Sequence, residues 1–63
     1  MKVYVITKAK SEDYHGRYDT TIEVHAVQEN AQKRVDTLIE ENNESDVDYW
    51  YTTYHVIEKI QSN

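Results

Sequence analysis

The sequence predicts an α+β domain with the element order β-β-α-β, in which a three-stranded sheet has its first strand at the centre and one helix on one face. Three observations support this: residues 2–7 are apolar on both faces of a strand, residues 18–26 alternate between apolar and polar, and residues 28–43 carry apolar side chains at helical spacing. A right-handed crossover through the helix places the last strand beside the first.

The first two predicted strands differ in character. In residues 2–7, Val3 and Val5 share one face while Tyr4 and Ile6 share the other, which is typical of a central strand covered on both sides. Residues 18–26 form a half-buried edge strand, whose apolar face is expected to hold Tyr18, Thr20, Ile22, Val24 and Ala26.

The intervening residues 8–17 are polar and contain the single glycine, Gly16. They are expected to form a turn region, either with His15 and Gly16 at the tip of a two-residue hairpin or with a longer loop.

The helix is predicted from a stripe of four apolar residues at the spacing i, i+4, i+7 and i+8, namely Ala31, Val35, Leu38 and Ile39. Val27 or Gln28 stands where a capping side chain would be expected, so the N-terminal cap is weak. Asn42 and Asn43 are expected to end the helix, because asparagine tolerates the left-handed conformation.

The last strand, residues 48–58, carries aromatic and β-branched side chains on both faces. One helix cannot cover both faces of a three-stranded sheet, so the surplus surface predicts a second copy of the chain. The predicted dimer interface consists of Tyr49, Tyr51, His55 and Ile57.

Size and charge limit the possible functions. The 63 residues form one domain, 1–63, with no cysteine and a net charge of −5. Acids dominate residues 36–58, which contain no lysine or arginine, so direct nucleic-acid binding is disfavoured. Either the acids dock on a basic host protein, through Glu40, Glu41 and Glu44, or they keep a small protein soluble. No apolar run suggests a leader or membrane span, which favours the cytoplasm and no membrane partner.

The sequence offers no catalytic signature. His15, His25 and His55 lie far apart on different predicted elements, so no metal site and no cofactor are expected. The serines lie in polar connectors and the tail, and one glycine cannot form a phosphate-binding loop. We therefore do not expect an enzyme.

Three segments resemble small phage and prophage proteins of Gram-positive bacteria: Met1-Lys2-Val3-Tyr4-Val5-Ile6-Thr7, Ser11-Glu12-Asp13-Tyr14-His15 and Glu29-Asn30-Ala31-Gln32-Lys33. The chain departs from that group after His15, where it inserts four residues, and in its more aromatic last strand. The resemblance implies a phage accessory protein of the β-β-α-β type and no known chemistry. Asp13, Tyr14 and His15 match the loop of that group and form either a binding site or a solvated turn.

These observations predict a small acidic accessory protein of phage type that acts by protein binding, as a homodimeric inhibitor of a host defence protein. Two alternatives remain open: a protein that sequesters a small molecule or nucleotide in aromatic pockets, and a structural interaction module with no inhibitory role.

Overall fold

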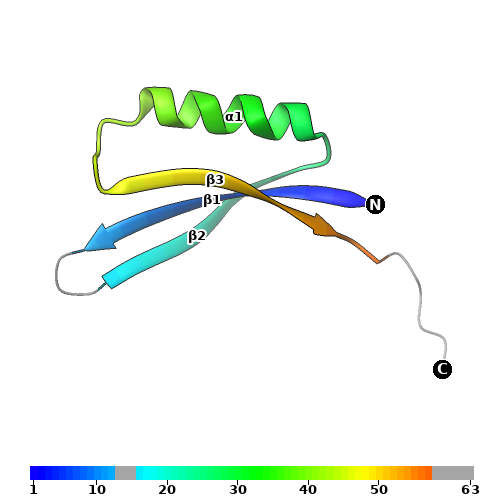
Figure 1. Ribbon diagram of the computed structural model, residues 1–63, viewed down its shortest axis with the longest axis horizontal. Helices are drawn as coiled ribbons and strands as arrows, with labels where there is room; N and C mark the ends of the chain where they lie inside the picture. The colour runs from blue at the N-terminus through cyan, green and yellow to red at the C-terminus, as the bar shows by residue number, and fades with distance from the viewer. Residues whose placement is uncertain (13–15, 58–63) are drawn as a thin grey trace.

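The computed structural model describes residues 1–12 and 16–57, and its elements follow the predicted order (Figure 1). They are β1 (Lys2–Glu12), β2 (Gly16–His25), α1 (Gln28–Glu41) and β3 (Val47–His55). β1 pairs antiparallel with both other strands, which gives the sheet order β2-β1-β3. The α+β fold with a central first strand and one helix is therefore confirmed.

The first strand is longer than predicted. The turn region expected over residues 8–17 is wrong in most of its length, because β1 continues to Glu12 and β2 begins at Gly16. Lys8 and Lys10 pair with Thr20 and Tyr18, so hydrogen bonds to neighbours extend the strand despite its polar composition. Gly16, the first residue of β2, has a φ of 81°, a conformation that favours glycine.

The strand register defines two faces of the sheet. Side chains on opposite partners point to the same face, so Ile6 shares its face with Tyr51, and Thr7 shares the other with Trp50. Helix α1 lies on the side of Ile6, because Gln28 donates a hydrogen bond to the Tyr51 hydroxyl over 3.0 Å. The opposite side is covered by no element of the described chain (Figure 1).

A β-bulge changes which residues of β2 face the helix. The register shifts between Ile6, which pairs with Glu23, and Thr7, which pairs with Thr21. Ile22 lines a groove with Lys8, and Glu23 bonds Arg34 of the helix, so two successive residues face the helix side. Val24 then points to the opposite side. The predicted single apolar face of Tyr18, Thr20, Ile22, Val24 and Ala26 is therefore wrong.

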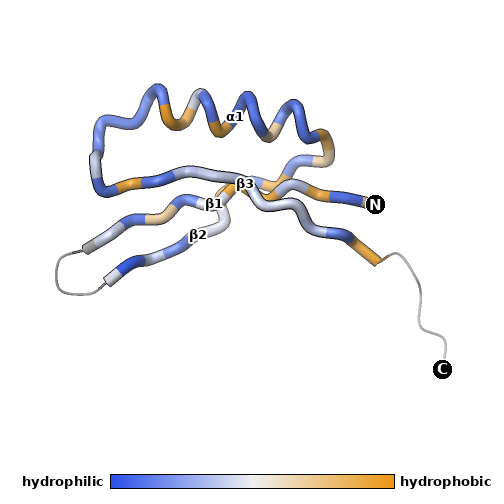
Figure 2. Tube along the Cα trace, viewed as in Figure 1, coloured by the Kyte–Doolittle hydropathy of each residue, from blue (hydrophilic) through white to orange (hydrophobic). Residues whose placement is uncertain are grey.

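The helix packs through a narrower stripe than its periodicity predicts. Ala31 and Val35 are buried and Leu38 is half-buried, but Ile39 is 54% exposed, so its predicted place in the core is wrong. Apolar residues recur along α1 between longer hydrophilic stretches (Figure 2). The helix bonds Tyr51 of β3 and Glu23 of β2, so it lies across the sheet from β3 to β2. Ile39 lies outside this contact between the helix and the sheet.

The two ends of the helix differ. Val27 at the N-terminal end makes no side-chain cap, as predicted. Asn42 at the C-terminal end is extended, with φ −74°, so the expected left-handed cap is wrong. Its side chain instead donates to the carbonyls of Glu44 and Val47, over 2.8 and 3.2 Å, and accepts from the Glu44 amide. Asn42 therefore ties the helix end to the start of β3.

The hydrophobic core is small for the length of the chain. Five apolar residues are buried in the described structure: Ile6, Ala9, Ala31, Val35 and Val47. Nine large apolar residues of the described chain are exposed: Met1, Tyr18, Ile22, Val24, Val27, Ile39, Tyr54, Val56 and Ile57. Because each fully buried aliphatic side chain contributes only about 1.5–3 kcal/mol, this core leaves a thin margin of stability for a lone chain.

Candidate functional site

The side of the sheet away from the helix forms the first candidate surface, which we call the open face. By register its uncharged part consists of Val3, Val5, Thr7, Thr21, Val24, Trp50, Thr52 and Tyr54, and the same face continues past Thr7 to Ala9, Asp48, Asp19 and Arg17. Val24 is 60% exposed and Tyr54 is 54% exposed, while Trp50 is half-buried. The open face is thus a β-branched and aromatic surface in contact with water.

One end of the open face carries the charges. The Arg17 guanidinium lies 5.3 Å from the centre of the Trp50 ring and 3.3 Å from Asp19, so it joins a cation–π contact to an ion pair. Arg17 belongs to β2 and Trp50 to β3, and Ala9 of the central strand lies between them in register, only 2% exposed. This contact bridges the full width of the sheet.

The predicted dimer-interface residues lie elsewhere. By register Tyr49, Tyr51 and His55 share the side of the sheet that faces the helix. Tyr51 packs edge-on against Tyr4 with ring centres 6.0 Å apart. His55 is exposed at the end of β3, and Ile57 follows the strand and is 83% exposed. The structure thus places Tyr49, Tyr51 and His55 on the helix side and Ile57 beyond the end of β3, and none of these four residues belongs to the open face as defined by the register.

The acids predicted to bind a partner gather at the end of the helix. Glu40 and Glu41 lie in the last helical turn and Glu44 in the connector, and all three are exposed. We call these three residues the acidic end. The last turn contains no basic residue. A helix carries partial negative charge at its C-terminus, so acids there cost stability.

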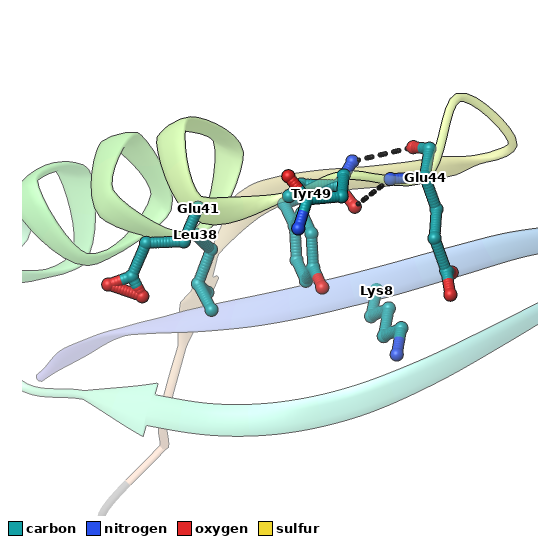
Figure 3. A pocket seen from close by; sticks show the side chains of 7 residues that line it. Lys8, Leu38, Glu41, Glu44 and Tyr49 are labelled. Atoms are coloured by element: carbon teal, nitrogen blue, oxygen red, sulfur yellow. Dashed lines mark hydrogen bonds between the residues drawn. The ribbon is translucent and has the colours of Figure 1, made fainter.

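A groove joins the acidic end to the central strand (Figure 3). It has a volume of about 280 Å³ and is lined by Lys8, Leu38, Glu41, Asn42, Asn43, Glu44 and Tyr49. Lys8 of β1 lies between the helix end and β2 in this view. Of the acidic end, Glu41 and Glu44 line the groove, and Glu40 does not.

A second groove shares Lys8 and follows the part of β2 that the helix leaves uncovered. It has a volume of about 360 Å³ and is lined by Lys8, Lys10, Tyr18, Thr20 and Ile22. The ion pairs of the described residues engage neither lysine. This groove was missed from the sequence, because residues 8–17 were expected to form a turn.

Glu23 links the helix to the edge strand and was also missed. Its carboxylate accepts from Arg34 Nε over 2.7 Å and lies 2.9 Å from His25 Nε2. The hydrogen bond from Arg34 lowers the pKa of Glu23 below its usual value of 4.5, and the contact with His25 adds to this. The same bond raises the pKa of Arg34. The bulge that turns Glu23 toward the helix has no signal in the sequence pattern.

The predicted loop site of Asp13, Tyr14 and His15 lies outside the described residues. Within residues 1–12 and 16–57, no group of three or more histidines and acids is placed to hold a metal ion. The described part of the chain also contains no helix long and apolar enough to cross a membrane. The candidate surfaces are therefore the open face, the acidic end and the two grooves that meet at Lys8.

No known protein family, curated protein or solved structure matches this chain.

Proposed function

We propose that this chain is a small accessory protein of phage type that acts by protein binding, as a homodimer that inhibits a host defence protein with a basic surface. The observation that carries the proposal is the position of the acidic end. Glu40 and Glu41 occupy the last helical turn, where the helix macrodipole opposes them by about 0.3–1 kcal/mol each. These acids lower the stability of a small domain that has a thin margin of stability. Their presence despite this loss favours a role for them in binding.

The neighbouring groove supports this role. Glu41 and Glu44 line its rim, with the half-buried Leu38 and Tyr49 beside them. A basic side chain of a partner would meet carboxylates, helix carbonyls and apolar surface for its stem in one place. Lys8 also lines this groove, but it forms no ion pair with Glu41 or Glu44 in the described structure.

The test compares two variants that remove equal charge. Glu40→Gln, Glu41→Gln and Glu44→Gln together neutralise the acidic end. The control removes three exposed acids elsewhere through Asp19→Asn, Glu29→Gln and Asp36→Asn. Each protein is expressed in bacteria that carry a panel of defence systems, and phage plating is measured.

We expect the wild type and the control to restore plating against at least one defence system, and the acidic-end variant to lose this effect. With the affected target purified, the acidic-end variant should associate more slowly, and the wild-type association rate should fall as salt rises. No effect of the wild type on any system would refute inhibition. Equal effects of both variants would show that the acidic end serves solubility.

The second groove favours one alternative, the sequestration of a small anionic ligand such as a nucleotide. Lys8 and Lys10 provide positive charge, and the 51% exposed Tyr18 provides an aromatic surface for a base. Its volume of about 360 Å³ is within the range of small-molecule sites. A thermal-shift screen with mononucleotides, repeated on the Lys8→Ala, Lys10→Ala double variant, tests this alternative. Stabilisation that disappears in the double variant would support it.

A further inference from the structure

The apolar surface of the chain is divided unequally between the two sides of the sheet. The helix side of the sheet contains the buried Ile6 and Val47, and the helix that covers it contributes the buried Ala31 and Val35. The open face has no covering layer in the described chain, yet it holds the only tryptophan, Trp50. A sheet with apolar side chains on both faces is stable in water when a second layer covers each face.

We propose that the open face is the seam of the homodimer, in which the open faces of two copies pack against each other as the two layers of a β-sandwich. This inference deepens the proposed function, since it rests on the proposed dimer and names its surface. Val24 and Tyr54, which are more than half exposed in the single chain, become buried on opposite flanks of the seam.

Charge selects a second copy as the occupant. The chain carries a net charge of −5, so two copies repel each other wherever their acids approach. Eight residues of the open face are uncharged, its charged residues (Arg17, Asp19 and Asp48) lie at one end, and the acidic end lies on the helix side of the sheet. A basic partner protein would meet the carboxylates Asp19 and Asp48 at that end, and Asp19 is already paired with Arg17. The uncharged part of the open face fits a neutral surface of similar chemistry, and a two-fold axis supplies that surface from the same chain.

The area of the open face, its charged end included, is close to the lower limit for a specific dimer. The nine register pairs from Lys2 to Lys10 extend about 30 Å at about 3.4 Å per residue, and three strands are about 14 Å wide. The two faces that would pack together thus have a combined flat area of roughly 840 Å². The side chains project from the sheet, so the accessible surface is larger than this flat area. Specific interfaces begin near about 1,000 Å² of total accessible surface, so the seam is close to this lower limit and a weak dimer is expected.

Two adjacent threonines provide a matched test. Thr52 and Thr53 are both exposed on β3, but Thr52 points to the open face and Thr53 to the helix side. Thr52→Glu places a carboxylate in the seam of each copy, whereas Thr53→Glu adds the same charge in water. Sedimentation equilibrium across the micromolar range measures the dissociation constant of each protein. The emission of Trp50 during dilution reports its exposure independently of mass.

We expect Thr52→Glu to raise the dissociation constant at least roughly 100-fold, because it buries unpaired like charges, and Thr53→Glu to leave it within roughly threefold of the wild type. Wild-type Trp50 emission should shift to the red on dilution, and Thr52→Glu should show the shifted emission at all concentrations. If the wild type is a dimer that both variants preserve, or that Thr53→Glu disrupts, the open face is not the seam and the homodimer stands. A monomeric wild type would refute the homodimer itself.

Discussion

The structure assigns a central role in stability to Ile6. It is the one large side chain that is fully buried in the described chain, at 0% exposure. It lies on the central strand, between Glu23 of β2 and Tyr51 of β3, on the side covered by the helix. The other buried residues are alanines and valines. We therefore predict that Ile6→Ala destabilises the domain more than any equivalent change in the helix.

The size of the effect follows from the size of the domain. Removing a buried isoleucine side chain to alanine costs about 2–5 kcal/mol, and Ile→Val costs about 0.5–1.5 kcal/mol. A 63-residue domain has a total stability of about 3–9 kcal/mol. Ile6→Ala should thus remove about half of the free energy of unfolding, while Ile6→Val should leave a measurable folded state.

Urea unfolding followed by circular dichroism measures both changes. With an m value of about 1 kcal/mol/M, Ile6→Val should lower the midpoint by about 1 M. The matched controls are Ile39→Val and Ile39→Ala, because Ile39 is 54% exposed on the helix. These should shift the midpoint by less than about 0.5 M, since surface changes lie within about 0.5 kcal/mol. Equal losses at both positions would show that the helix packs through Ile39, as its periodicity predicts, and would refute the packing described above.

Two further predictions concern the polar contacts that hold the helix. Because the pKa of Glu23 is lowered in the folded state, its contribution to stability is present above pH about 4.5 and is lost as the pH falls through the folded value. The stability difference between wild type and Glu23→Gln, from urea unfolding, should therefore shrink toward zero below pH 4.5; a constant difference would contradict the bond to Arg34. Asn42→Ala should lower the melting temperature by about 4–8 °C per kcal/mol, for a loss of about 1–2 kcal/mol. The exposed neighbour Asn43→Ala should be near neutral, and an equal effect of both would exclude a special role for the Asn42 side chain.

The sequence alone predicts the architecture because its patterns are local. The apolar residues on both faces of 2–7 require a central strand, and the spacing of Ala31, Val35 and Leu38 requires a helix. The right-handed crossover then leaves one place for the last strand. These three rules together lead to the order β2-β1-β3 that the structure has.

The candidate surfaces could be predicted only in part. The exposure of Glu40, Glu41 and Glu44 follows from their place off the apolar stripe. The second groove could not be predicted, because it requires Lys8 and Lys10 to lie in a strand beside Tyr18. A polar segment considered by itself indicates a turn, because its pairing with a neighbouring strand is not visible in the local sequence pattern.

The sequence by itself thus determined the order of the elements, the central strand and the helix, since these depend on periodicity within single segments. Only the tertiary structure decided which side chains are covered. The bulge opposite Ile6 turns Glu23 toward the helix and Val24 away from it, and the register with β3 places Tyr51 under the helix and Trp50 on the open face. Both depend on pairing between strands, and a shift of one residue in register exchanges the two faces of a strand.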